Sequence, residues 1–186
     1  MGSPALIIRA SCEADRGAIV ALHVAAFGEA EGEEVSALAN DLLDDPTAMP
    51  LLSLVAEQNG QIIGHVHFSA VRVLGDEEEV PGMILAPLAV APTAQGRGIG
   101  SELTLDGLER LRAESVGLVF VLGHPAYYPK FGFQPAAALG LDAPYPIEDK
   151  NAEAWMVQEL HPGYLDRVKG IVHCADSLMV PKHWIE

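Results

Sequence analysis

The most informative stretch of the chain is LAVAPTAQGRGIG, residues 88–100. Its first three residues are typical of the end of an apolar strand, and a helix is expected to begin inside the glycine-rich turn that follows. Backbone N–H groups in the first turn of a helix have no intrahelical partner and lie at the positive end of the helix dipole. Glycines let a phosphate approach these groups, and Arg97 adds a charged donor. The stretch therefore predicts a turn that binds a pyrophosphate.

Two other glycine-rich phosphate motifs do not fit these residues. A dinucleotide-binding fingerprint requires a third glycine where the chain has Ser101, and it follows the first strand of a βαβ unit rather than a series of antiparallel strands. A P-loop requires a lysine directly after its last glycine, and no lysine follows Gly98 or Gly100. The plain structural alternative is a glycine-rich helix start that binds no ligand.

Hydrophobic periodicity and turn residues divide the rest of the chain into alternating strands and helices. Asn59-Gly60 indicates a tight β-hairpin turn, because both residues accept positive φ angles. Gly28 and Asp45-Pro46 are helix stops. The expected elements are a strand at 6–9, a helix capped by Ser11 and running to about 27, a helix at 31–45, antiparallel strands at 51–57, 61–74 and 81–90 with a reversal at 75–79, a helix at 97–114, a strand at 118–122, a short helix opened by Pro125 and a strand at 154–157.

This order predicts an α/β fold with a mixed, mostly antiparallel central sheet flanked by helices. A length of 186 residues indicates one domain, since domains average roughly 150 residues. We expect a single domain at 1–186, with its core at about 5–160. A C-terminal extension at 161–186 is expected to add a short strand near residues 170–174.

Composition and charge exclude several classes of protein. Hydrophobic residues make up 49% of the chain and charged residues 20%, which argues against a disordered chain. The net charge of −15 argues against nucleic-acid binding and against an anionic membrane surface. It fits a cationic substrate, although a solubility role alone explains it too. The longest apolar run, residues 83–91, is about half of the roughly 18 residues that a membrane span needs.

The two cysteines carry little functional signal. Cys12 and Cys174 lie at opposite ends of the chain and lack the C-x-x-C spacing of a zinc site. Neither a disulfide framework nor a cysteine-bound metal is indicated, and a reducing cytoplasm is the expected compartment.

Residues 88–100 resemble the pyrophosphate motif of the GNAT superfamily of acetyl-CoA-dependent N-acetyltransferases. The family pattern [QR]-x-x-G-x-[GA] is matched by Gln95, Gly98 and Gly100. A second family pattern, Tyr-x-Lys-x-Gly-Phe, is matched downstream by residues 128–133. Two motifs in the family order are far more specific than either alone, and the expected element order is similar to a GNAT along most of residues 5–160. Residues 123–128 and the tail are similar to the YhbS-like branch of the family.

The resemblance implies a GNAT fold whose fourth and fifth strands splay apart around acetyl-CoA. Leu88, Ala89 and Val90 would then pair with the pantetheine arm, and the N–H of Val90 would polarise the thioester carbonyl. The turn that would hold the pyrophosphate consists of Gln95, Gly96, Arg97, Gly98, Ile99 and Gly100. A primary amine, on a small molecule or a peptide, would attack the acetyl group directly in a ternary complex, without a metal and without a nucleophilic side chain.

The resemblance also assigns a proton donor. Tyr128 matches the tyrosine of the second motif, and a phenol with a pKa near 10 is a reasonable acid for a departing CoA thiolate. The alternative is a core tyrosine whose hydroxyl bonds to backbone. Its neighbour Tyr127 would face the sulfur only if the short helix were rotated.

The sequence indicates less clearly which residue takes a proton from the attacking amine. Many family members have a glutamate on or beside the fourth strand, but residues 83–91 contain no acidic side chain. His124 follows the fifth strand and lies one helical turn before Tyr128, so we expect it near the cleft as a base or water relay, with an ordinary loop histidine as the alternative. His65 and His67 share one face of their strand, which indicates a solvent-facing surface or a substrate pocket. An H-x-H metal pair would lack a third ligand.

Acidic side chains also precede the second helix. Glu29, Glu31, Glu33 and Glu34 would border the acceptor site in this family, or form only a solvated helix start. Because the strand lacks an acid, an acyl-CoA-binding sensor without turnover is a second functional hypothesis. The exposed strand surfaces of such a fold allow a homodimer.

Overall fold

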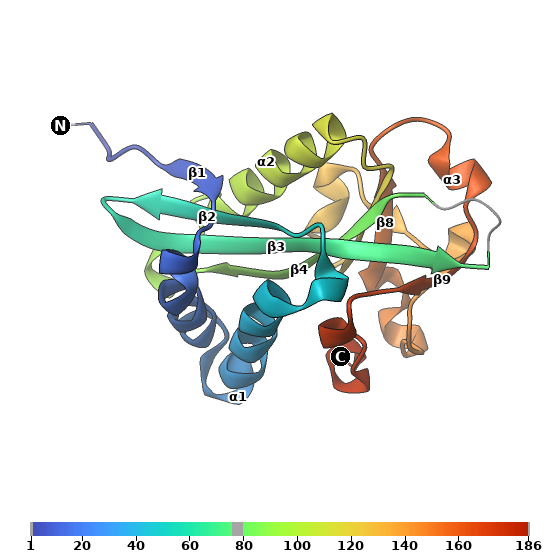
Figure 1. Ribbon diagram of the computed structural model, residues 1–186, viewed down its shortest axis with the longest axis horizontal. Coiled ribbons are helices and arrows are strands. Elements are labelled where there is room, and N and C mark those ends of the chain that lie inside the picture. Colours follow the sequence, from blue (N-terminus) through green and yellow to red (C-terminus); the bar gives the residue numbers. More distant parts are fainter. Residues whose placement is uncertain (1, 76–79, 186) are drawn as a thin grey trace.

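The computed structural model describes residues 2–75 and 80–185, and its centre is one mixed sheet with helices on both faces (Figure 1). Strands follow one another across the sheet in the order β1-β2-β3-β4-β5-β8-β6, and β9 pairs with both β3 and β7. The prediction of a mixed α/β fold is confirmed. The strands are β1 (Ile7–Ala10), β2 (Leu52–Gln58), β3 (Gln61–Leu74), β4 (Gly82–Val90), β5 (Leu118–Leu122), β6 (Gln134–Pro135), β7 (Leu141–Asp142), β8 (Trp155–Glu159) and β9 (Gly170–His173).

Three α-helices and several 3-10 helices complete the fold of the described residues. The α-helices are α1 (Arg16–Asp44), α2 (Ile99–Ala113) and α3 (Tyr164–Arg167). The 3-10 helices are Glu13–Asp15, Pro46–Ala48, Pro92–Ala94, Tyr128–Phe131, Ala137–Leu139, Asp149–Ala154, Asp176–Leu178 and Pro181–Trp184. No helix in the described parts of the chain is long and apolar enough to cross a membrane.

The first three long strands form the antiparallel meander that the sequence predicts. Asn59 and Gly60 have φ angles of 53° and 72°, which close the turn between β2 and β3. β3 then pairs with β4 in the same antiparallel sense. The reversal expected between β3 and β4 falls largely on residues 76–79, outside the described residues.

Helix α1 contains the break that the sequence predicts. Gly28 has φ 76° and ψ −170°, so it separates two helical segments. The start of the helix differs from the prediction, because Ser11 donates to the Ser53 hydroxyl instead of capping the helix. Asp15 accepts from the N–H of Cys12 and pairs with Arg9, and the α-helix begins at Arg16.

Alternate side chains of β2 show that α1 and α2 cover opposite faces of the sheet. Leu54 and Ala56 pack in the cluster that contains the inner face of α2, whereas Val55 packs with Ile19 and Ala39 of α1. The inner face of α2 consists of Ile99, Leu103, Leu108 and Leu111, as its helical spacing predicts.

Strands β4 and β5 part from each other in the middle of the sheet. Their parallel pairing runs from Gly82 opposite Leu118 to Leu85 opposite Val121 and then ends. β4 continues to Val90, still paired with β3, whereas β5 ends at Leu122. The last residues of β4 therefore have an edge that β5 does not cover.

The C-terminal part of the chain returns to the sheet. β9 pairs antiparallel with the end of β3, which confirms the short strand predicted near residues 170–174. Trp184 is buried and its ring lies 5.6 Å from that of Trp155, edge to face. Both tryptophans are core residues, and the tail is packed against the body of the protein.

Candidate active site

A cleft opens where β4 and β5 part. Its volume of about 1250 Å³ exceeds the roughly 300–1,000 Å³ of pockets for drug-sized ligands. Its walls come from α1, the end of β4, the turn before α2, the loop after β5 and the C-terminal segment. The predicted site residues that line it are Leu88, Val90, Gln95, Gly96, Gly98, Ile99, Gly100, His124 and Tyr128.

The glycine-rich turn forms one end of the cleft. Gly96 and Gly98 have φ angles of 76° and 81°, in the region that glycine alone enters without strain, and Gly98 caps the start of α2. The side-chain amide of Gln95 donates to the carbonyl of Val90 at 3.1 Å, which ties the turn to the end of β4. The start of α2, whose first N–H groups have no intrahelical partner, therefore lines the cleft, as an anion site requires.

Two predicted binding residues lie differently from the others. The side chain of Ala89 is buried, because successive residues of β4 point to opposite faces of the sheet. Arg97 does not line the cleft; its guanidinium donates to Oε1 of Gln58 on β2 at 2.9 Å. Arg97 is exposed, and this contact is made at the protein surface.

Tyr128 lies in an aromatic cluster at the closed side of the cleft. Its ring is almost fully buried, packed edge to face against Phe133, and lies directly against Gly123, which has no side chain to displace it. Burial, with a smaller contribution from Tyr127, raises the pKa of the Tyr128 hydroxyl well above its usual value. The phenol is therefore protonated at neutral pH, as a proton donor must be.

Tyr127 reaches the turn instead. Its hydroxyl lies 3.3 Å from the Oγ of Ser101, at the start of α2. A Cβ atom on Gly100 would lie only 3.1 Å from the same hydroxyl. Lys130 lies over the Tyr127 ring at 3.9 Å from its centroid, in a cation–π contact. The sequence did not assign this role to Tyr127, and the absence of a side chain at Gly100 is its only trace in the sequence.

His124 lies at the mouth of the cleft, as predicted. Its side chain is exposed, and its carbonyl accepts hydrogen bonds from the N–H groups of Tyr127 and Tyr128 at 3.0 and 3.3 Å. His124 therefore fixes the turn that carries both tyrosines, while its imidazole stays in contact with solvent.

The far end of the cleft combines α1 with the C-terminal segment. Two of the four predicted acidic residues, Glu31 and Glu34, line it, and Glu29 and Glu33 do not. Oε1 of Glu34 lies 3.2 Å from Nδ1 of His183 and 3.7 Å from Nζ of Lys182. Sequence reasoning missed both Lys182 and His183, since nothing local in the sequence indicates that the tail folds back to α1. The segment contributes Leu178, Lys182, His183, Trp184 and Ile185.

The expectation of a solvent-facing or pocket role for His65 and His67 is wrong. Both are fully buried beneath α1, outside the cleft lining. His65 contacts His23 and the hydroxyl of Ser53, and Nε2 of His67 lies 2.9 Å from the carbonyl of Ala39. Among the described residues, no group of three or more His, Cys, Asp or Glu side chains is arranged to hold a metal ion.

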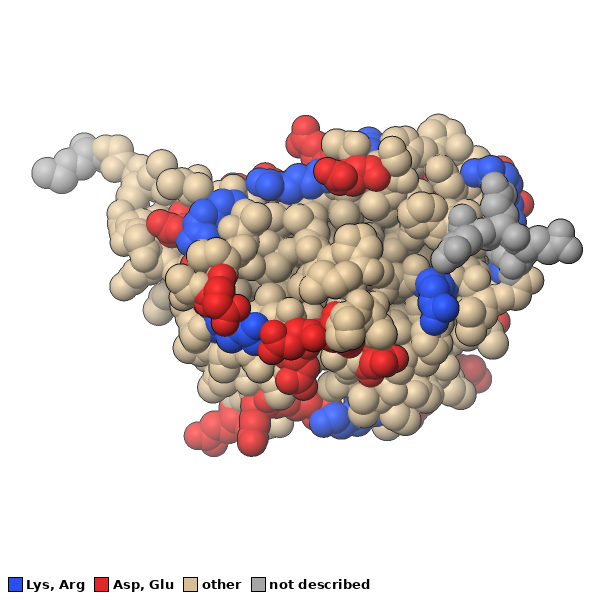
Figure 2. Space-filling view, in the orientation of Figure 1, with Lys and Arg blue, Asp and Glu red and all other residues tan. Residues whose placement is uncertain are grey.

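Surface charge is uneven. Figure 2 shows acidic side chains gathered over α1, and the opposite edge of the same face carries both signs. The charged residues that line the cleft are balanced: Glu31, Glu34, Lys130 and Lys182. The net charge of −15 is therefore not concentrated in the cleft.

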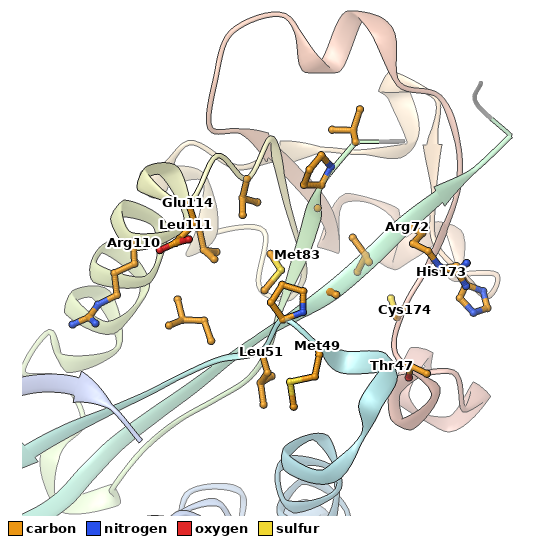
Figure 3. A pocket seen from close by; sticks show the side chains of 18 of the residues that line it. Thr47, Met49, Leu51, Arg72, Met83, Arg110, Leu111, Glu114, His173 and Cys174 are labelled. Atoms are coloured by element: carbon orange, nitrogen blue, oxygen red, sulfur yellow. The ribbon is translucent and has the colours of Figure 1, made fainter. Parts of the chain in front are cut away.

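A second cavity of about 850 Å³ lies at the other end of β4 (Figure 3). Met83 forms its floor, with Leu111 from α2 on one side and Met49 and Leu51 on the other. None of the predicted site residues lines it. The cleft at the glycine-rich turn is therefore the candidate active site.

A strand edge left open beside a glycine-rich helix start is the geometry that the two sequence motifs predicted. A family model described as an acetyltransferase (GNAT) domain matches residues 7–136. The chain belongs to the GNAT family. As a GNAT protein it is an acyltransferase, and its mixed α/β architecture is the GNAT fold.

Relatives and solved structures agree with this assignment. The GNAT chain is 39% identical over 165 residues to the uncharacterized N-acetyltransferase YjhQ of Escherichia coli K12, which covers 88% of this chain and 89% of YjhQ. The crystal structure of E. coli YhbS in complex with CoA superimposes with a TM-score of 0.85 at 32% identity, covering 96% of this chain and 94% of YhbS. The crystal structure of a GNAT family acetyltransferase from Brucella melitensis in complex with acetyl-CoA superimposes with a TM-score of 0.74 at 26% identity. The match covers 94% of this chain and 98% of the Brucella protein.

Proposed function

We propose that the protein transfers the acetyl group of acetyl-CoA to a primary amine in a ternary complex. The observation that carries this proposal is the cleft between β4 and β5, which begins at the glycine-rich turn and ends between α1 and the tail. A long ligand at the turn and an acceptor at the far end would meet beside Leu88 and Val90. The relatives solved with CoA and acetyl-CoA support the same cofactor here.

The residues present fit acetyl-CoA. In the proposed complex, backbone groups of Leu88, Ala89 and Val90 bind the pantetheine arm along the uncovered edge of β4. The turn binds the pyrophosphate through the N–H groups of its six residues, and the Arg97 side chain adds charge. These binding residues are Gln95, Gly96, Arg97, Gly98, Ile99 and Gly100.

Bound acetyl-CoA would supply an activated acetyl group whose carbonyl carbon accepts the lone pair of the amine. The N–H of Val90 polarises the thioester carbonyl, and the Tyr128 hydroxyl gives its proton to the departing sulfur. The second proton lost by the amine nitrogen restores the Tyr128 hydroxyl. Overall, an ammonium ion and a thioester become an amide, a thiol and one released proton.

His124 has a supporting role in this proposal. It is exposed at the mouth of the cleft and holds the turn that carries Tyr128. Its imidazole relays protons between the cleft and bulk water in this proposal. We place the protein in the cytoplasm, where its two free cysteine thiols would stay reduced.

Calorimetric titration with acetyl-CoA, CoA and NADH tests the cofactor assignment. We expect micromolar binding of both CoA species and none of NADH. Gly98→Trp, which fills the turn at a positive φ angle, should abolish the binding. A primary-amine panel with thiol detection then tests transfer. Binding without thiol release would favour an acyl-CoA sensor, and a folded protein that binds neither CoA species would overturn the proposal.

A further inference from the structure

The contact between His183 and Glu34 lies at the end of the cleft that α1 and the C-terminal segment form. Its two members come from opposite ends of the chain, yet Nδ1 of His183 is 3.2 Å from Oε1 of Glu34. The His183 side chain is only 13% exposed, whereas Glu34 is 41% exposed. Both line the cleft that also contains Tyr128. A carboxylate that holds one ring nitrogen of a cleft histidine is the arrangement that orients a general base.

The segment that carries His183 is rigidly attached to the protein body. Next to it, Trp184 is buried against Trp155 and donates to the carbonyl of Leu178 at 2.8 Å. Upstream, the N–H and hydroxyl of Ser177 both donate to the carboxylate of Asp45. His183 is therefore held between two anchors, and its position does not depend on the Glu34 contact alone.

The free side of the imidazole is available for chemistry. Because Nδ1 faces Glu34, the Nε2 atom is the one left for a ligand, and within the described residues it has no hydrogen-bond partner. Burial lowers the pKa of His183 below its usual value, and Lys182 acts in the same direction, while Glu34 opposes them. Neutral imidazole is the form that accepts a proton at physiological pH.

We infer that His183, oriented by Glu34, is the general base that takes a proton from the acceptor ammonium. This inference rests on the proposed function. It supplies the general base, for which β4 offers no acidic side chain. The proton passes from the nitrogen of the acceptor to Nε2 of His183 and then to solvent, and the freed lone pair forms the C–N bond. Other titratable or charged groups that face the cleft are Glu31 on α1, Lys182 on the same segment, and His124, Tyr127, Tyr128 and Lys130 after β5.

The wall that α1 contributes to the cleft is partly apolar, with Phe27, Val35 and Leu38 among its lining residues. We therefore choose 2-phenylethylamine as the probe, with its β,β-difluoro analogue as a partner of nearly the same shape. The fluorines withdraw electrons, so the analogue is largely deprotonated at neutral pH and does not need a base. His183→Ala should lower kcat for 2-phenylethylamine by about 100-fold and for the analogue by less than about threefold.

Three further measurements separate a base from a structural residue. Imidazole added to His183→Ala should restore transfer to 2-phenylethylamine. Glu34→Gln should lower the pKa of His183, measured by NMR in the protein without ligand, because the carboxylate raises that pKa. Acetyl-CoA affinity should be the same in wild type, in His183→Ala and in His161→Ala, whose partly buried side chain lies outside the cleft lining.

The outcomes distinguish the inference from the proposed function. An equal loss of kcat with both amines in His183→Ala, or no rescue of that variant by imidazole, would overturn the base assignment. The proposed acetyl transfer would still stand. Wild-type protein that binds acetyl-CoA but acetylates neither amine would count against the proposed transfer to primary amines itself. Selective loss with the unfluorinated amine, together with rescue, would establish His183 as the base.

Discussion

Nε2 of His23 on α1 lies 2.8 Å from Nδ1 of His65 on β3, and both rings are fully buried. The second nitrogen of His65 contacts Ser53 at 3.0 Å, and the ring of His67 lies 4.3 Å from that of His65. Nδ1 of His23 and Nδ1 of His67 have no partner among the described residues. Such a cluster is compatible with neutral rings only, because a buried charge here would lack a counter-ion.

Acid should therefore destabilise the protein at a pH where its carboxylates are still charged. Burial lowers the pKa of His23 to about 3 and that of His67 to about 4, against an unfolded value of 6.5. The unfolded chain thus binds more protons than the folded one, so stability is full above pH 6.5 and is lost as the pH falls toward the folded values. Each histidine contributes a loss of about 1.4 kcal/mol per pH unit. Urea unfolding between pH 7.5 and 4.5 measures this slope.

The control for this slope is His23→Phe. It removes one buried titrating ring and should reduce the slope by about 1.4 kcal/mol per pH unit. A wild-type free energy of unfolding that is flat down to pH 4.5 would contradict the buried, neutral cluster.

Glycine-to-alanine substitutions in the two long helices should have opposite effects. A Cβ on Gly107 of α2 would lie 2.2 Å from the ring of Phe68, so Gly107→Ala should destabilise by about 1–3 kcal/mol through overpacking. A Cβ on Gly17 of α1 meets nothing within 4 Å, so Gly17→Ala should stabilise by about 0.5–1 kcal/mol. Thermal unfolding of the two variants measures the difference. Similar shifts in Tm for Gly107→Ala and Gly17→Ala would mean that α2 does not lie so close to β3.

Local signals in the sequence were enough to predict most of the longer elements and the glycine-rich turn before α2. The Asn59-Gly60 hairpin, the break at Gly28 and the helix start at Gly98 depend on the φ angles of neighbouring residues, which residue types reveal directly. The same locality explains why Tyr128 could be proposed as a site residue, since its motif is contiguous.

Contacts between distant segments were not predictable in this way. The alternation of His65 and His67 showed that they share a face, but only the packing of α1 determines that this face is buried. Likewise, His183 meets Glu34 because Trp184 docks on Trp155, a packing event that no short motif encodes.

Tyr128→Phe should separate the proton-donor role from binding. The change removes one oxygen and keeps the packing against Phe133, so acetyl-CoA affinity should be unchanged while kcat falls by about 100-fold or more. Tyr127→Phe is the neighbouring control. The Tyr127 hydroxyl contacts Ser101 at the turn. Its removal should therefore weaken CoA binding and change kcat little. Calorimetry and thiol release measure both, and the reverse pattern would exchange the roles of the two tyrosines.

Asp45→Asn should loosen the tail from the body. The buried carboxylate accepts four hydrogen bonds, two from Thr47 and two from Ser177, and these outweigh burial, so that the pKa of Asp45 is lowered to about 2. An amide replaces one acceptor oxygen by a donor that faces other donors, which should cost about 2–3 kcal/mol. Urea unfolding measures this loss. Faster proteolysis within residues 176–185 and slower acetyl transfer should accompany it.

The control is Asp44→Asn, at an exposed carboxylate paired with Arg16. It should leave the stability, the rate of proteolysis and the rate of transfer nearly unchanged. Equal effects of the two substitutions would contradict an anchor at Asp45.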